Sequence, residues 1–463
     1  MSQPRRAIPI TGRLGEALAA ALAVGVLSFI TLFAGACNLP MSPTPALPTL
    51  ARTPIPVVTV TPTPPLTTTP VLTPSSAITL TLWFPPELAP SQQPEGKVLA
   101  AQYQAFQEMY PNWKIAGMVK KATGPGGLLD YLQTTSRVVP AQMPDLVALD
   151  LQEVKLAAEL GLLQPLDPLL PAEIESDLFP VADTYVVSGG KRIALPYEMD
   201  IRFLAYDTAL VTEPPLRWRD VLSNTRGYLF PFGEGDVGVV DAPLFQYYAA
   251  GGSLFDAEGQ PTIDEATLAS VLRFYQQGLD VGAIHTATLT ATTLAECWEI
   301  YLSGGAPLTE ASMARYLADR SRLANTRYAP LPTSTGVIAT IGQGWAWCLV
   351  TPVPQRQQAA VALLSWLMEE ENLVVRSQAS HHLPLRRSAL AESVQDDQLT
   401  AFIAELLERA YLRPPLRDYA ALARLWHTAV QDVLLGNAKP EQAAQEVAAF
   451  IRSLRQTQQM PLR

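Results

Sequence analysis

Two carboxylates stand close together in a run of residues that is typical of an extended strand. Glu198 and Asp200 are two positions apart, so an extended chain places both side chains on the same face. A pair at this spacing could supply the acid and the base of a glycoside hydrolase, whose carboxyl groups lie roughly 5 to 9 Å apart. The alternative is an ordinary solvated or hydrogen-bonding pair.

Aromatic rings and further carboxylates occur near the ends of other predicted strands. Sugar hydroxyls bind carboxylate, amide or guanidinium groups, and the flat CH faces of a sugar stack on aromatic rings. The residues of these two kinds that could line such a cleft are Trp83, Phe84, Glu87, Asp150, Tyr197, Phe230, Trp345 and Trp347. Because side chains alternate along a strand, Trp345 and Trp347 point to the same face. We expect at least one of this pair to be packed in the core and the other to be shared with the cleft.

Other kinds of chemistry find little support in the sequence. The three cysteines, Cys37, Cys297 and Cys348, form neither a disulfide framework nor a zinc-binding spacing. Cys297 and Cys348 could pair in an oxidising compartment, although two buried free thiols are the commoner state. His381 and His382 are neighbours that point in opposite directions on an extended chain, so we expect no shared metal. No phosphate-binding glycine loop, nucleophile elbow or zinc-protease helix occurs, and we expect no cofactor.

The composition argues against a nucleic-acid-binding protein. The 463 residues carry a formal net charge of -10 with a pI near 5.1, and no run of Lys and Arg offers a basic face. With 48% hydrophobic residues the chain can bury a large core. Its length exceeds what one core usually organises, so we expect two lobes.

The elements that must position these side chains alternate between strands and helices. Strand-like runs and helical periodicity follow one another over residues 78–84, 96–110, 113–119, 126–136 and 144–150. This order predicts a mainly parallel sheet with helices on both faces. Because ligands of such sheets bind beyond the carboxyl ends of the strands, the loops after Phe84 and Leu149 are candidates for one wall of a site.

The first 36 residues have the order of an export signal. Three arginines precede an apolar stretch that ends in small residues, as in a signal peptide. Gly35 and Ala36 before Cys37 resemble the lipobox of bacterial lipoproteins, which implies a lipid on Cys37. The alternative is an uncleaved transmembrane anchor, since roughly 20 apolar residues can span a bilayer. Either arrangement places the mature chain outside the cytoplasm, because the arginines mark the cytoplasmic side.

Residues 37–77 are dominated by Pro and Thr and carry almost no charge. Such a segment cannot bury a core and prefers the extended polyproline geometry. At about 3.1 Å per residue it could hold a domain as much as roughly 100 Å from a membrane. We therefore expect a disordered stalk between the lipid and the folded chain.

Several short motifs follow one another in a specific order. They are Leu80-Thr81-Leu82-Trp83, Pro144-Asp145-Leu146-Val147, Pro165-Leu166-Asp167, Gly251-Gly252-Ser253-Leu254-Phe255, Ile263-Asp264 and Gly342-Gln343-Gly344-Trp345-Ala346-Trp347. In this order they resemble the family 1 extracellular solute-binding proteins of ABC importers, the group that includes maltose-binding protein. The resemblance covers almost everything from Ile78 to about Leu390.

The resemblance implies a two-lobe α/β fold of the periplasmic-binding-protein type (type II), in which each lobe is a mainly parallel sheet flanked by helices. The first lobe would take residues 78–190 and 338–392, and the second residues 191–337 and 393–463. A hinge between the lobes would close them on the solute. Glu310 would face the cleft by the same analogy.

The implied function is the capture of a small solute, which we expect to be a sugar, by a monomer that delivers it to the permease subunits of an ABC importer. In this family the stretch around Glu198 and Asp200 binds or hinges and does not cleave, so the resemblance favours a binding protein over an enzyme. Two alternatives stay open: a secreted glycosidase that uses Glu198 and Asp200, and a surface sensor or adhesion module presented by the stalk.

Overall fold

The computed structural model describes residues 77–459 except 168, 224–226, 234, 236–239 and 418. Residues 1–76 contain the predicted signal peptide, Cys37 and nearly all of the predicted stalk, and they lie outside the described residues. No helix in the described part of the chain is long and apolar enough to cross a membrane.

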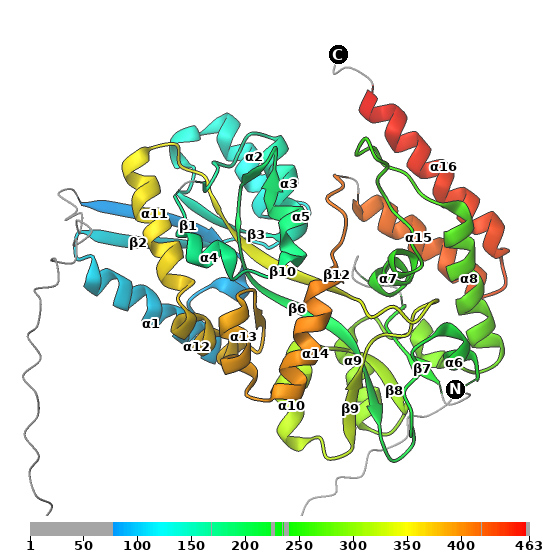
Figure 1. Ribbon diagram of the computed structural model, residues 1–463. Coiled ribbons are helices and arrows are strands. Elements are labelled where there is room, and N and C mark those ends of the chain that lie inside the picture. The colour runs from blue at the N-terminus through cyan, green and yellow to red at the C-terminus, as the bar shows by residue number, and fades with distance from the viewer. Residues whose placement is uncertain are drawn as a thin grey trace, which may run out of the picture. The chain divides into compact units, whose positions relative to one another are not determined.

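The N-terminal part of the fold alternates strands and helices as the sequence predicts (Figure 1). Its elements are β1 (Ile78–Phe84), α1 (Pro94–Met109), β2 (Trp113–Val119), α2 (Leu128–Val138), β3 (Leu146–Asp150) and α3 (Leu151–Glu159). Strand β1 pairs in parallel with β2 on one side and with β3 on the other. The first four residues of β3 are buried, because this strand lies inside the sheet and helices cover both faces.

The remaining strands are β4 (Val187–Ser188), β5 (Lys191–Arg192), β6 (Leu195–Asp207), β7 (Tyr228–Leu229), β8 (Leu308–Ser312), β9 (Thr326–Ala329), β10 (Thr340–Leu349), β11 (Leu383–Pro384) and β12 (Ala410–Tyr411). The remaining α-helices are α4 (Ala172–Ser176), α5 (Asp183–Val186), α6 (Trp218–Ser223), α7 (Asp241–Ala249), α8 (Glu265–Asp280), α9 (Leu294–Leu302), α10 (Met313–Asp319), α11 (Pro354–Leu367), α12 (Glu370–Ser380), α13 (Arg387–Val394), α14 (Asp397–Glu408), α15 (Tyr419–Leu434) and α16 (Pro440–Gln459).

Two long strands, β6 and β10, connect the two halves of the described chain. The main sheet has the order β2-β1-β3-β10-β6-β8-β7, and β10 runs antiparallel to both β3 and β6. The first part of β6 pairs with β10 and β11, and its second part pairs with β8 and β9. The sheet is therefore mixed: it is parallel from β1 to β3 and antiparallel where the halves are joined.

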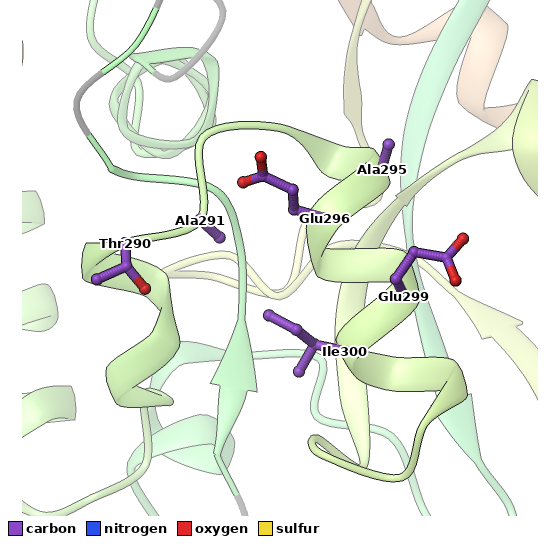
Figure 2. A pocket seen from close by; sticks show the side chains of 6 residues that line it. All are labelled: Thr290, Ala291, Ala295, Glu296, Glu299 and Ile300. Atoms are coloured by element: carbon purple, nitrogen blue, oxygen red, sulfur yellow. The ribbon is translucent and has the colours of Figure 1, made fainter. Parts of the chain in front are cut away.

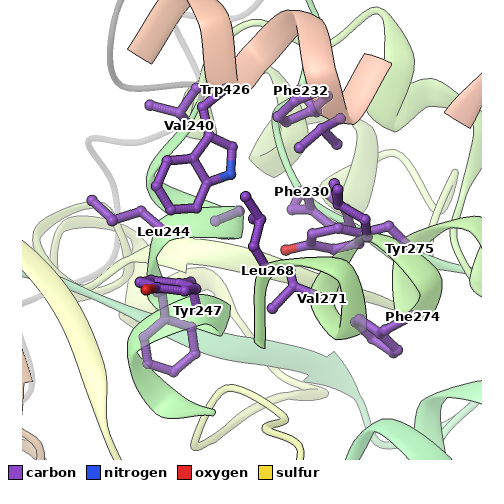
Figure 3. Packing of buried hydrophobic residues seen from close by; sticks show 14 of the residues in the cluster. Phe230, Phe232, Val240, Leu244, Tyr247, Leu268, Val271, Phe274, Tyr275 and Trp426 are labelled. Atoms are coloured by element: carbon purple, nitrogen blue, oxygen red, sulfur yellow. The ribbon is translucent and has the colours of Figure 1, made fainter. Parts of the chain in front are cut away.

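Each half has its own apolar core. In the first half, side chains of β1, β3, α1 and α11 form one cluster. In the second half, another cluster gathers α7, α8, α15 and α16, and Figure 3 shows Phe230, Tyr275 and Trp426 within it. A third cluster runs from α2 and α3 to α9, α10 and α14. The boundaries that the family resemblance gives to the two lobes remain a prediction.

Aspartate side chains cap the first turns of two of these helices. Asp150 accepts a hydrogen bond from the Gln152 N–H of α3 at 2.8 Å. Asp264 does the same for the Thr267 N–H of α8. Such caps satisfy backbone donors that have no partner inside the helix. The hydrogen bond from the Gln152 N–H holds the Asp150 side chain at the start of α3.

Strands β6 and β10 approach each other closely at a glycine. A Cβ atom at Gly344 would lie 2.6 Å from the Glu198 carbonyl oxygen and 2.7 Å from the Met199 Cβ. Distances this short do not occur between real side chains and backbone, so a larger residue would have to push the two strands apart. The pairing also contains a bulge between Trp345 and Ala346, which bends β10 at this point.

We predict that Gly344→Val destabilises the protein by about 1–3 kcal/mol, because the added side chain overpacks the contact between β6 and β10. The free energy of unfolding from urea titration measures the effect. Ala116→Val on the exposed edge strand β2 is the control, since the Ala116 side chain faces solvent. Equal stability of the two variants would contradict the prediction.

Candidate functional site

A cavity of about 280 Å³ lies where α3 and α5 meet α7 and the chain after β12. Its walls consist chiefly of Lys155, Tyr185, Tyr248, Phe255, Tyr411 and Pro414. We call this cavity the aromatic chamber. It brings together residues from four separate parts of the chain.

The tyrosines of the aromatic chamber are fixed by contacts with one another and with the backbone. The rings of Tyr248 and Tyr411 stack with their centroids 5.1 Å apart. The Tyr185 hydroxyl donates a hydrogen bond to the Leu412 carbonyl at 3.1 Å. Burial raises the pKa of Tyr185, Tyr248 and Tyr411, so all three phenols are neutral at physiological pH. The chamber thus offers apolar ring faces together with uncharged hydroxyl groups.

A narrow polar seam lies beside the aromatic chamber, next to the strands that connect the two halves. Its polar residues are Asp150, Gln152, Gln343 and Arg413, and only about 10 Å³ of free space separates them. Burial raises the pKa of Asp150, although the nearby Arg413 acts in the opposite direction. Arg413 also reaches the Gln343 side-chain oxygen at 3.5 Å. The seam therefore places a carboxylate of the first half opposite a guanidinium that follows β12.

A buried network of charges holds Arg413 in place. Asp241 accepts two hydrogen bonds from Arg413, at 2.7 and 2.8 Å, and one from Arg202 at 2.5 Å. Burial alone would raise the pKa of Asp241, but the two guanidinium groups outweigh it and hold the pKa below its ordinary value. Glu310 lies 3.5 Å from Arg202 and accepts a hydrogen bond from the Tyr228 hydroxyl at 2.6 Å. The positive charges of Arg202 and Arg413 thus compensate the negative charges of Asp241 and Glu310.

Two of the side chains expected to line a cleft lie within this network or beneath it. Glu310 is 1% exposed, and burial raises its pKa. Phe230 packs on Tyr275 in the core of the second half, with ring centroids 5.1 Å apart (Figure 3). Both residues are buried in the second half, and neither lines the chamber or the seam.

Several other expected residues gather in the core of the first half. The Trp347 ring lies 6.4 Å from the rings of both Phe84 and Tyr197, and all three side chains are at most 2% exposed. Trp345 is half-buried and packs against the same cluster, so the predicted shared face of the two tryptophans is observed. Trp83 is also buried, with its ring 5.5 Å from that of Tyr131. These aromatic side chains therefore pack in the apolar clusters to which the first half contributes.

Glu198 forms a buried ion pair. It receives two hydrogen bonds from Arg376 of α12, at 2.9 and 3.0 Å. Arg376 also donates to the backbone carbonyls of Glu95 and Glu87, while the Glu87 side chain is exposed. Burial would raise the pKa of Glu198, but Arg376 and then His382 outweigh it, so the pKa lies below its ordinary value. Glu198 thus fastens β6 to α12 and to the loop after β1.

Asp200 has a different set of partners on the second half. Its carboxylate accepts hydrogen bonds from the Ser312 hydroxyl at 2.6 Å and from the Ala314 N–H at 2.9 Å. These groups belong to the first turn of α10, where unpaired backbone donors attract a carboxylate. Glu198 and Asp200 are therefore each engaged by separate structural partners, and neither lines the chamber or the seam.

The two described cysteines, Cys297 and Cys348, are unpaired and buried. Burial raises the pKa of both thiols, so neither is a reactive thiolate at physiological pH. The preferred expectation of two free buried thiols is confirmed. No cluster of His, Cys, Asp and Glu among the described residues could hold a metal ion.

A shallow hollow of about 450 Å³ on the second half, lined by Thr290, Glu296, Glu299 and Ile300, offers fewer means of holding a solute (Figure 2). The Glu296 carboxylate already accepts hydrogen bonds from the backbone and hydroxyl of Thr292. No aromatic ring lines this hollow. The aromatic chamber is therefore the better candidate site.

Sequence reasoning found Asp150 of the seam and Glu310 of the network, but it missed Lys155, Tyr185, Asp241, Tyr248, Tyr411 and Arg413. Two local signals were available. Asp241 stands at the start of a helix that also carries a pair of tyrosines, and a Tyr-Leu-Arg-Pro-Pro segment interrupts the helical pattern near the C-terminus. Neither signal indicates by itself that the two segments meet.

Two α/β halves joined by β6 and β10, with the candidate site beside these strands, define a type II periplasmic-binding-protein fold. The profile of bacterial extracellular solute-binding proteins matches residues 101–401, and the chain belongs to this family. Membership places the protein outside the cytoplasm. No curated protein matches the sequence.

Solved structures of similar fold include three sugar-binding proteins. The sugar-binding protein MalE of Xanthomonas citri superposes with a TM-score of 0.69 at 18% identity, over 82% of this chain and 98% of that chain. The cyclic alpha-maltosyl-1,6-maltose binding protein of Arthrobacter globiformis gives 0.68 at 16% identity, over 82% and 99%. Maltose-bound MalE3 of T. maritima gives 0.65 at 18% identity, over 82% and 100%. At these identities the likeness concerns the fold.

We predict that Glu198→Gln lowers the free energy of unfolding at pH 7 by about 3–5 kcal/mol, because it leaves the buried charge of Arg376 without its partner. The pKa of Glu198 is lowered in the folded state. The contribution of the pair is therefore fully present above the unfolded pKa, near 4.5, and is lost as the pH falls further.

Urea unfolding at pH 7 and at low pH measures both parts of this prediction. The difference between the native protein and the variant should shrink as the pH decreases. Glu392→Gln is the control, because Glu392 is exposed on α13. A variant as stable as this control at pH 7 would show that the ion pair adds nothing to the fold.

Proposed function

We propose that the protein captures a carbohydrate in the aromatic chamber and delivers it to an ABC-type importer. The observation that carries this proposal is the convergence of three neutral tyrosines, Tyr185, Tyr248 and Tyr411, on one cavity beside the connecting strands. Ring faces of this kind stack on the CH faces of a sugar, and phenol hydroxyls exchange hydrogen bonds with its hydroxyls.

The names of structurally similar proteins support a carbohydrate as the solute. Besides the maltose-binding relatives, they include the GacH receptor of Streptomyces glaucescens, solved in complex with acarbose, and an ABC transporter solute-binding protein from Thermotoga lettingae bound with alpha-D-tagatose. The family match supports the same general role for this chain.

Closure of the two halves would couple binding to transport. A solute held between α3 of the first half and α7 of the second contacts both halves at once, so it stabilises the arrangement in which they lie close together. Strands β6 and β10 are the connections that must bend during this movement. The closed form is then the form that the permease subunits recognise.

We further propose that the protein works as a lipid-anchored monomer on the outer face of the cytoplasmic membrane. Residues 1–36 would be removed as a signal peptide, Cys37 would carry the lipid, and residues 37–77 would act as the stalk. The supporting features are the arginines, the apolar stretch and the small residues before Cys37. The two lobes would follow the boundaries given by the family resemblance.

We propose that the protein binds its solute without chemical change. The two carboxylates that a glycosidase would need are occupied, Glu198 by Arg376 and Asp200 by the start of α10. Neither is free to protonate a glycosidic oxygen or to attack a sugar carbon. We predict no release of chromophore from chromogenic glycosides by the native protein. Turnover that disappears in Glu198→Gln would establish a glycosidase instead.

We predict that Tyr248→Ala weakens saccharide binding by about threefold to tenfold, the effect of losing one ring contact. Isothermal titration calorimetry and thermal shift with a panel of monosaccharides, disaccharides and oligosaccharides provide the measurement. Tyr328→Ala is the control, since Tyr328 is a half-buried tyrosine of β9 outside the chamber. The proposal fails if no member of the panel binds the native protein or raises its melting temperature.

A further inference from the structure

The aromatic chamber contains one charged side chain among its described lining residues. That residue is Lys155, in the middle of α3. The other lining residues are aromatic, aliphatic, hydroxyl-bearing or glycine, and none of them is a carboxylate. Carboxylates are one of the groups that hold neutral sugars, because they accept hydrogen bonds from sugar hydroxyl groups. The described wall of this chamber offers an ammonium group in their place.

The charge of Lys155 is not compensated within the described part of the chain. Neighbouring cations differ in this respect: Arg413 is held by Asp241, and Arg417 lies 4.0 Å from Glu159. Lys155 forms no ion pair or hydrogen bond with a described side chain, and it is half-buried on the wall of the chamber. A half-buried ammonium beside aromatic rings gains free energy when an anion reaches it.

Two of the hydroxyl groups that line the chamber with Lys155 can donate hydrogen bonds to a solute. The phenols of Tyr248 and Tyr411 keep their protons at physiological pH and can each donate one hydrogen bond. The Tyr185 proton is already given to the Leu412 carbonyl, and the Ser253 hydroxyl donates to the Phe255 carbonyl at 2.7 Å. The donors that stay free therefore include the Lys155 ammonium group and the Tyr248 and Tyr411 hydroxyls, and all three can donate to a carboxylate.

We propose that the saccharide bound in the aromatic chamber carries a carboxylate, as a uronic acid does, and that this carboxylate pairs with Lys155. The sugar ring would lie against the tyrosines while its acidic substituent faces α3. A carboxylate matches the site better than a phosphate, because one lysine supplies one positive charge. This inference rests on the proposed carbohydrate-binding function of the same chamber.

Calorimetric titration of the purified full-length protein tests the proposal. The probes are D-glucuronate and D-galacturonate, their neutral parents glucose and galactose, and glucose 6-phosphate as the phosphate arm. We expect the uronates to bind about 10- to 100-fold more tightly than the neutral parents, the usual effect of a charge-assisted hydrogen bond. The preference should decrease as the salt concentration rises, since the pair is only half-buried.

Variants of Lys155 separate a direct contact from a structural role. Lys155→Gln should remove the preference for uronates over their neutral parents, whereas Lys155→Arg should retain most of that preference. Lys97→Gln is the matched control, because Lys97 is an exposed lysine on helix α1. Equal melting temperatures of the unliganded proteins would show that the variants fold normally.

The possible outcomes distinguish this inference from the function on which it rests. Neutral sugars that bind as well as uronates, with no effect of Lys155→Gln, would overturn the inference and leave carbohydrate capture intact. Tighter binding of glucose 6-phosphate than of either uronate would overturn the choice of a carboxylate. If none of the five probes nor any saccharide of the broader panel binds, both proposals fail together.

Discussion

The aromatic chamber depends on one buried carboxylate that two arginines share. Asp241 begins α7, Arg202 lies on β6, and Arg413 follows β12, so their ion pairs fix three distant segments against one another. Tyr248 stands two helical turns after Asp241, and Tyr411 stands two residues before Arg413. The ion pairs therefore help to hold the segments that carry these two stacked rings. Loss of either arginine would leave the two carboxylates, Asp241 and Glu310, with a single buried guanidinium, so one buried negative charge would be uncompensated.

The local elements of the fold could be predicted from the sequence, because their signals are local. The apolar runs at 78–84, 113–119 and 144–150 and the helical spacing between them correspond to β1, β2, β3, α1 and α2 within a few residues. The sequence was less informative about which side chains of a strand point into the core and which point to solvent. Both faces of this sheet are covered by helices, so alternation along β6 or β10 does not tell which aromatic ring meets solvent. Tyr197 and Trp347 consequently fit a cleft and a core equally well.

Glu198 and Asp200 show more clearly that a local pattern does not reveal the partners of a side chain. The spacing of Glu198 and Asp200 correctly marked two polar groups in a largely buried strand, but their roles come from partners far along the chain. Arg376 is 178 residues from Glu198, and Ser312 is 112 residues from Asp200. A buried carboxylate is stable when a guanidinium or a helix start lies beside it, and no local pattern carries that information. The pair is thus divided between two structural tasks on either side of the connection between the halves.

The distribution of charge between the halves suggests how binding and closure are linked. The network of Arg202, Asp241, Glu310 and Arg413 is already balanced, so it can position rings without attracting an ion. The uncompensated charge of Lys155 lies on α3 of the first half, across the chamber from Tyr248 of the second. A solute that stacks on the rings and also reaches the ammonium must touch both halves at once. Its affinity for the closed arrangement then exceeds its affinity for any open one, and that difference is the free energy available to move the halves together.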